Sequence, residues 1–261
     1  MRAIWSGAIG FGLVNIPVKL FSATQDSNLD LEMLDKHGHA NIRYARINES
    51  TGKEVAWENI VKGYKYDDDY VVLTDEDFEK VSPRKSKMID INEFLKEDSI
   101  DTVYFDTPYY LEPTKGGEKA YVLLREALKQ SGKVALGEYV LRTRQNLCLL
   151  KPQDDVILLL KIRFAEEIRS YEDLNIPKDI TVKPAELKMA QALINQLTPK
   201  KTSLDKYKDT YDEELMKIIE AKAKGKKVTQ PKFKIVQNKS KDLMSQLKAS
   251  LEGGGTKKKA S

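Results

Sequence analysis

The chain contains few of the residues from which metal centres and nucleophilic active sites are built. Its 261 residues include one cysteine, Cys148, and two histidines, His37 and His39. A single cysteine excludes a disulfide framework, and its place in the apolar run NLCLL predicts a buried, unreactive thiol in a reducing compartment. The two histidines are spaced i, i+2 with no cysteine nearby, which does not match zinc-ligand spacing, so we expect them in a loop or hairpin.

Signals for nucleotide binding and membrane insertion are also missing. The glycines of IGFGL, residues 9–13, are followed by neither the Lys-Ser nor the Lys-Thr of a phosphate loop, and they lack the dinucleotide-binding fingerprint. The longest purely apolar run, residues 156–160, is far too short to cross a bilayer, and no signal peptide is evident after Arg2. We therefore expect a cytoplasmic protein with no cofactor and no membrane partner.

One acidic run raises the question of a metal-dependent nuclease. Asp67, Asp68 and Asp69 are consecutive, so on a strand their side chains diverge, and no glycine turn accompanies them. A solvated surface explains this run better than a metal site does. Because no arrangement of His, Cys or Ser indicates a nucleophile either, we expect no enzymatic activity.

Positive charge is concentrated at one end of the chain, although the net charge is only +4. Residues 222–261 carry twelve lysines against two acidic residues, a net of +10, which leaves residues 1–221 with 32 basic and 38 acidic groups, a net of −6. A tail rich in Lys, Gly, Ser and Thr cannot form a core and commonly binds a polyanion, although a merely solubilising tail would have the same composition. The net negative charge of residues 1–221 is compatible with DNA binding only if the acidic residues of the segment 67–79 face outward while arginine side chains line an inner surface.

Apolar alternation predicts strands over most of the first 165 residues. The opening stretch is typical of a β-barrel: residues 2–20 alternate, Gly7, Gly10 and Gly12 permit a bend or a close backbone approach, and Pro17 confines the strand to an edge or an end. The other expected strands are residues 42–48, 70–73, 101–105, 108–112, 137–142, 146–150 and 156–163. The sequence NESTG, residues 48–52, predicts a hairpin turn.

Helical periodicity appears in five places. We expect a short helix with an acidic first turn over residues 75–81, and a helix over 118–130 that ends at Ser131-Gly132 and buries Tyr121, Leu124, Ala127 and Leu128. Two more run from Pro184 to Thr198 and from Tyr211 to Lys224, and either pack back on their own subunit or wrap a second one. Their apolar faces carry Leu187, Ile194, Leu197, Leu215, Ile218 and Ile219.

A fifth helix is predicted over residues 240–251, within the basic tail. Leu243, Met244, Leu247 and Leu251 would share one face, and three glycines, residues 253–255, would end it. A helix this short is unstable alone in water, so we expect it to fold on a partner.

The opening string RAIWSGAIGFGLVNIPVKLFSAT, residues 2–24, resembles the first strand of the prokaryotic Ku family, the DNA-end-binding proteins of non-homologous end joining. Further strings follow in the family's order, so the resemblance extends from about residue 2 to about residue 225. They are IRYARINESTGKEV (42–55), ENIVKGYKYDDDYVVLTDEDFE (58–79), IDTVYFDTPYYLEP (100–113), GKVALGEYVLRTRQNLCLL (132–150), and ELKMAQALINQLT followed by YKDTYDEELMKIIEAKAKG (186–225).

This resemblance implies a mainly β chain with helices, of the α+β class. Residues 1–180 would form a Ku-like β-barrel with an extended bridge that encircles DNA. Residues 181–224 would form a helical dimerisation arm, and residues 225–261 a largely flexible basic extension. Two subunits would build a ring through which duplex DNA threads.

Candidate DNA contacts follow from the positions of basic residues. On an extended LRTRQ strand Arg142 and Arg144 share a face about 7 Å apart, a spacing suited to phosphates rather than bases. In IRYARI, by contrast, Arg43 and Arg46 fall on opposite faces unless the hairpin twists. The full set of expected DNA contacts is Lys36, Arg43, Arg46, Lys53, Lys115, Arg142 and Arg144, with Lys226, Lys227, Lys232 and Lys234 from the tail.

The function that the resemblance implies is sequence-independent binding of double-stranded DNA ends by a homodimer that recruits an ATP-dependent end-joining DNA ligase. Leu243 and Leu247 are the candidate contacts to that ligase. The protein would act in the bacterial cytoplasm at the nucleoid. An alternative is an architectural nucleoid protein that binds duplex DNA without preference for ends.

Overall fold

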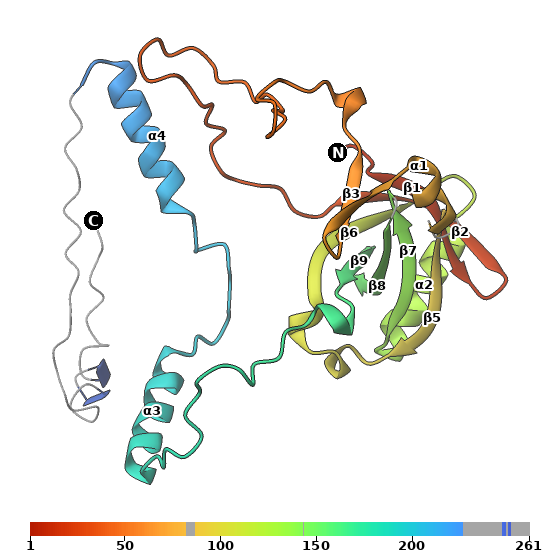
Figure 1. Ribbon diagram of the computed structural model, residues 1–261. Coiled ribbons are helices and arrows are strands. Elements are labelled where there is room, and N and C mark those ends of the chain that lie inside the picture. Colours follow the sequence, from red (N-terminus) through yellow and green to blue (C-terminus); the bar gives the residue numbers. More distant parts are fainter. Residues whose placement is uncertain (82–86, 143, 227–246, 249, 252–261) are drawn as a thin grey trace. The chain divides into compact units, whose positions relative to one another are not determined.

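The computed structural model describes residues 1–81, 87–142, 144–226, 247–248 and 250–251 (Figure 1). The chain divides into two units, Met1–Tyr171 and Glu172–Ser261. None of the helices in these residues is long and apolar enough to cross a membrane.

Seven strands of the first unit close into a barrel in the order β1-β2-β6-β9-β8-β7-β5. Neighbouring strands are antiparallel except for β1 and β5, which run parallel where Ala8 pairs with Met88 and Ile9 with Ile89. The closed barrel confirms the predicted fold class. Its strands are β1 (Trp5–Phe11), β2 (Val14–Ser22), β5 (Met88–Leu95), β6 (Phe105–Pro113), β7 (Val134–Leu141), β8 (Arg144–Gln153) and β9 (Val156–Ile162).

The first predicted strand, residues 2–20, is in fact a hairpin of two strands. Gly12 adopts a left-handed conformation, with φ of 58°, and reverses the chain between β1 and β2. The turn places Ile9 opposite Ile16, and both are fully buried. The buried side chains change from an odd position on β1, Ile9, to even positions on β2, Ile16 and Val18, which a single alternation over residues 2–20 does not allow. Pro17 lies within β2, opposite Ala8 of β1 and one residue before the pairing of β2 with β6 begins at Val18, so the predicted edge or end position holds only on the β6 side.

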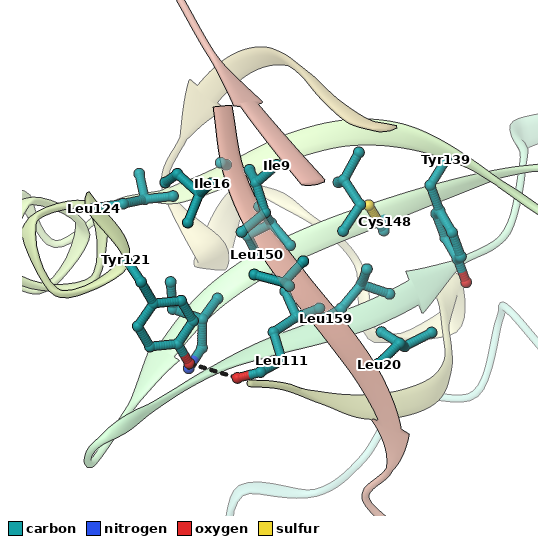
Figure 2. Packing of buried hydrophobic residues seen from close by; sticks show 14 of the residues in the cluster. Ile9, Ile16, Leu20, Leu111, Tyr121, Leu124, Tyr139, Cys148, Leu150 and Leu159 are labelled. Carbon is teal, nitrogen blue, oxygen red and sulfur yellow. Dashed lines mark hydrogen bonds between the residues drawn. The ribbon is translucent and has the colours of Figure 1, made fainter. Parts of the chain in front are cut away.

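The barrel interior is filled by aliphatic side chains from all seven strands, and helix α2 (Glu118–Ser131) completes it (Figure 2). Tyr121, Leu124 and Leu128 of α2 are buried as expected, whereas Ala127 is exposed. The helix ends at Gly132, which takes the left-handed conformation that favours glycine. Cys148 is fully buried in this core, as predicted, and burial raises the pKa of its thiol.

The Tyr121 hydroxyl ties α2 to two strands of the barrel. It donates a hydrogen bond to the Leu111 carbonyl of β6 at 2.6 Å, drawn in Figure 2, and accepts one from the Ile157 amide of β9 at 2.7 Å. Burial raises the pKa of Tyr121, which favours the protonated hydroxyl that these two hydrogen bonds require. One phenol therefore satisfies two buried backbone groups at once.

Two predicted strands are absent from the structure. Residues 42–48 form no strand, and the ladder pairs around them are isolated bridges, Leu34 with Asn41 and Ile47 with Glu54. All of residues 42–48 are exposed, so the alternation there has no core to face. Residues 102–104 form a short 3-10 helix, η3 (Thr102–Tyr104), just before β6. Three further 3-10 turns are η1 (Trp57–Asn59), η2 (Glu97–Ser99) and η4 (Ala165–Glu167).

Other local predictions around these segments are confirmed. In the NESTG turn the Asn48 carbonyl accepts from the Gly52 amide, while its side chain accepts from the amides of Ser50 and Thr51. The expected strand at 70–73 lies within β4 (Asp69–Leu73), which pairs with β3 (Lys62–Tyr66) in a separate two-stranded sheet. The short acidic helix is α1 (Asp75–Val81).

The second unit contains the two helices expected after the barrel. They are α3 (Pro184–Leu197), with Pro184 in its first turn, and α4 (Thr210–Ala223), capped by the Asp209 side chain, which accepts from the Tyr211 amide. Neither helix has a fully buried residue. Of the helix predicted at 240–251, residues 247–248 and 250–251 are helical, and the others lie outside the described residues.

The dual role of Tyr121 predicts a clear loss of stability in Tyr121→Phe. The substitution leaves the Leu111 carbonyl and the Ile157 amide buried without this partner, at a cost of roughly 1–3 kcal/mol. We expect a lower thermal midpoint by circular dichroism at matched protein concentration. Tyr171→Phe, at a position 71% exposed, is the control and is expected to leave the midpoint unchanged. Equal midpoints for both variants would contradict the anchoring role.

Candidate nucleic-acid interface

Strand register gathers several basic side chains at one end of the barrel. Because Leu147 of β8 pairs with Ile162 of β9, the β7–β8 turn with Arg142 and Arg144 lies at the same end as Arg163. Strand β2 runs toward this end as well, although its last residue, Ser22, pairs with Tyr109 at the middle of β6. We call this end the arginine end.

The arrangement of Arg142 and Arg144 differs from the prediction. They do not share the face of one strand, because Arg142 lies in the β7–β8 turn with φ of 63°, and Arg144 begins β8 opposite Leu141. Both side chains are exposed, and the Arg144 carbonyl accepts a hydrogen bond from the Asn146 side chain at 2.8 Å. The alternation argument failed because a turn lies between the two residues. Two exposed guanidiniums at a hairpin tip still suit contacts to phosphates.

The sequence analysis did not identify two further cations at the arginine end. Lys161 and Arg163 alternate at the end of β9, directly after the apolar run 156–160, a pattern that could have identified them. The Lys161 ammonium lies 3.0 Å from a carboxylate oxygen of Asp106, and the Arg163 guanidinium lies 3.9 Å from the other. The hydrogen bond from Lys161 holds the pKa of Asp106 below its usual value. This carboxylate neutralises part of the positive charge at the arginine end.

Between the barrel strands β2 and β5 the chain forms a long exposed segment. From residue 24 to residue 61, which we call the bridge, every residue except Leu29 and Val55 is exposed. Tyr44 is 84% exposed and Trp57 is 72% exposed, although large aromatic side chains normally contribute to a core or an interface. The bridge therefore has almost no core of its own and presents its side chains for contact.

Four predicted DNA contacts lie on the bridge, and all are exposed. Lys36 lies in a turn closed by a hydrogen bond from the Asp35 amide to the Ala40 carbonyl. Arg46 places its guanidinium 4.5 Å from the centre of the Trp57 ring, and its carbonyl accepts from the Val55 amide at 2.7 Å. The remaining two are Arg43 and Lys53, the latter next to the NESTG turn.

Lys115 is the candidate that the fold separates from the others. It follows β6, where the Thr114 amide donates to the Pro17 carbonyl, so it lies at the end of the barrel opposite the arginine end. The nine residues of β6 span about 30 Å between these two ends. A role for Lys115 in DNA binding stays a prediction without support from neighbouring candidates.

The tail candidates fall mostly outside the described residues. Lys226 is described and exposed, and Leu247 is half-buried in a helical turn. Lys227, Lys232, Lys234 and Leu243 lie outside the described residues.

The acidic segment at residues 67–79 has a local structural role in part. Asp67 and Asp68 form the turn between β3 and β4, while Asp77 accepts hydrogen bonds from the Thr74 amide and hydroxyl at the start of α1. These hydrogen bonds hold the pKa of Asp77 below its usual value. Among the residues that the structure describes, no group of three or more His, Cys, Asp or Glu side chains is arranged to hold a metal ion.

Comparison with known proteins places this barrel in a defined class. Residues 10–189 match the family model described as the Ku70/Ku80 beta-barrel domain. Curated relatives named "Non-homologous end joining protein Ku" match far beyond the barrel. The relative from Coxiella burnetii is 40% identical, covering 100% of this chain and 98% of its own.

Two other relatives with the same name are similarly close. The one from Pseudomonas aeruginosa is 40% identical, with coverage of 100% and 92%, and the one from the archaeon Archaeoglobus fulgidus is 39% identical, with coverage of 97% and 99%. The chain belongs to the Ku family, as its sequence motifs indicated.

If the arginine end contacts DNA, reversing its charge has a specific effect. The double variant Arg142→Glu/Arg144→Glu should bind duplexes of every sequence more weakly by a similar factor, because phosphate contacts carry no sequence information. Fluorescence anisotropy with two unrelated duplexes measures this. The matched control is Lys129→Glu/Lys133→Glu, which reverses two exposed charges beside the start of β7, at the opposite end of the barrel. Equal loss of affinity in both double variants would exclude a local role for the arginine end.

Proposed function

We propose that this chain binds the ends of double-stranded DNA without regard to sequence in non-homologous end joining, as a non-catalytic homodimer. The observation that carries the proposal is full-length similarity, at about two-fifths identity, to proteins named for non-homologous end joining. The exposed bridge and the arginine end support it, because exposed cations contact phosphates independently of sequence.

Recognition of an end is proposed to come from topology rather than from base contacts. One barrel with its bridge spans part of the circumference of a duplex, and a second copy related by two-fold symmetry completes a ring. Only a duplex with a free end can be threaded through a closed ring. Residues 1–180 form the barrel and bridge in this proposal, residues 181–224 the arm and residues 225–261 the basic extension.

The experiment that tests end recognition compares linear duplex with relaxed closed circles of the same sequence at physiological salt. Threading predicts tight binding to the linear form, and reduced loading when bulky hairpins cap both ends. Comparable binding to closed circles would instead support the architectural nucleoid protein, which has no preference for ends. Magnesium-dependent loss of DNA during the incubation would indicate a nuclease.

The arm is proposed to hold the two subunits together. Leu187, Ile194 and Leu197 of α3 are 52%, 63% and 70% exposed, so this apolar face has no cover within the described residues. On α4, Ile219 is 38% exposed and both Leu215 and Ile218 are half-buried. Uncovered apolar faces on successive helices are typical of surfaces that pack on a partner.

A charge on the arm is therefore predicted to separate the subunits. Ile194→Asp should convert a dimer without DNA into a monomer of 29.7 kDa and weaken end binding with it. Light scattering at micromolar concentration gives the mass. Ala192→Asp, exposed on the opposite face of α3, is the control and should remain dimeric. A wild-type chain that is monomeric under these conditions would contradict the dimer.

The basic extension is proposed to contact DNA or an ATP-dependent end-joining DNA ligase. Deleting residues 226–261 removes ten lysines and two acidic residues, none of which belongs to the barrel core. Each phosphate contact contributes about −0.9 to the slope of log affinity against log salt, so the truncated chain should show a flatter slope and retain its preference for ends. An unchanged slope would leave ligase binding or solubility as the role of the tail. Leu247→Asp in a ligation assay tests the ligase role.

A further inference from the structure

The bridge contains a hairpin that holds a cation against an aromatic ring. The NESTG turn, residues 48–52, reverses the chain, so that the Val55 amide donates to the Arg46 carbonyl at 2.7 Å. Trp57 lies two residues beyond Val55, and a side chain at this diagonal position is within reach of a long or aromatic neighbour on the other strand. The Arg46 guanidinium accordingly lies 4.5 Å from the centre of the Trp57 ring.

Neither side chain of this pair belongs to a core. Arg46 is exposed, and Trp57 is 72% exposed at the start of the 3-10 turn η1. Burial of the indole therefore does not explain why the two groups meet. At this distance the positive charge is attracted to the negative face of the ring, and the contact restricts side-chain torsions that an exposed arginine otherwise samples freely.

Arg46 differs in its surroundings from the paired arginines of the barrel unit. The Arg125 guanidinium lies 2.9 Å from Glu126, and the Arg163 guanidinium lies 3.9 Å from Asp106. Among the residues that the structure describes, by contrast, no carboxylate forms an ion pair with Arg46. The indole occupies a face of the guanidinium and does not use its N–H groups, which point outward in the guanidinium plane. Arg46 is therefore restrained without being neutralised.

We propose that Trp57 is a positioning residue for DNA binding, whose ring holds the Arg46 guanidinium so that its N–H edge donates to a backbone phosphate. This inference rests on the proposed function, because it takes duplex DNA as the ligand of the bridge. A planar, charged fork matches the geometry of a phosphate, and an arginine already restrained by a ring loses less conformational freedom on binding. Trp57 thereby raises the affinity for DNA of any sequence without contacting the DNA itself.

A double-mutant cycle tests this coupling in the full-length chain. Fluorescence anisotropy with a linear duplex gives the affinities of the wild type, Arg46→Ala, Trp57→Ala and the double variant. Trp57→Ala should weaken binding by a factor of about two to five for each subunit, the size of an exposed cation–π contact. In the Arg46→Ala background the same substitution should cause little further loss, because the ring then has no cation to hold.

Lys53 supplies the matched control, since it is an exposed cation beside the same turn and belongs to none of the described cation–π pairs. In the Lys53→Ala background Trp57→Ala should cause its full loss of affinity, so that the two effects add. Trp57→Phe should recover part of the affinity, because a phenyl ring also binds a cation over its face, although more weakly than an indole does.

Two results of the cycle would overturn the inference. An equal loss from Trp57→Ala in the Arg46→Ala and Lys53→Ala backgrounds would mean that the indole contacts DNA directly or only supports the fold of the hairpin. No loss from Trp57→Ala in the wild-type background would mean that the stack does not contribute to binding.

Failure of the proposed function is distinguishable from failure of this inference. Equal binding of the wild-type chain to linear duplex and to closed circles would contradict end recognition, while the coupling between Arg46 and Trp57 would still be measurable. A wild-type chain that bound no duplex would overturn both.

Discussion

One constraint determines the rest of this structure: burial is confined to the barrel and the helix that closes its core. Every fully buried apolar residue among those described lies on a barrel strand or on α2, from Ile9 to Ile162. The closed sheet leaves no free edge, and Tyr121 satisfies two backbone groups where α2 meets the strands. The bridge, the β3–β4 sheet and the arm gain almost nothing from this core. Within one copy the bridge is held by local hydrogen bonds, such as that from the Val55 amide to the Arg46 carbonyl, rather than by a shared core.

Charged side chains, like buried ones, are concentrated in particular parts of the molecule. The described cations at the arginine end belong to a hairpin tip and to the end of β9, and Asp106 neutralises part of that charge. If the arginine end contacts phosphates, as proposed, this partial neutralisation would moderate the strength of the contact compared with a cluster of unpaired cations. The negative charge of residues 1–221 is consistent with this arrangement, because acids such as Asp77 are engaged in local caps rather than in the cluster.

Sequence patterns predicted most of the helices and strands, because these elements depend on local signals and on short periodicities. The helices α2, α3 and α4 were found because their apolar faces, proline starts and glycine ends are all local signals. The failures have two causes: alternation does not mark a local turn, and whether a segment has a sheet to join depends on partners distant in sequence. Residues 42–48 alternate but have none, and residues 2–20 contain a turn. For the same reasons the sequence placed Arg142 and Arg144 on one strand and did not identify Lys161 and Arg163, whose proximity to those arginines follows from strand register.

Because burial is confined to the barrel, the stability of the parts outside it would depend on the partners that cover them. A two-stranded sheet is marginal in water by itself, and β3 and β4 expose Tyr64, Tyr66 and Tyr70, each about two-thirds to three-quarters exposed. Partners that cover such surfaces bind the folded form only, so they stabilise it by mass action. Partner binding would then order the bridge and arm while leaving the barrel, with its complete core, essentially unchanged. Amide hydrogen exchange would accordingly divide the chain into a protected barrel and an outer part whose protection rises with each partner bound.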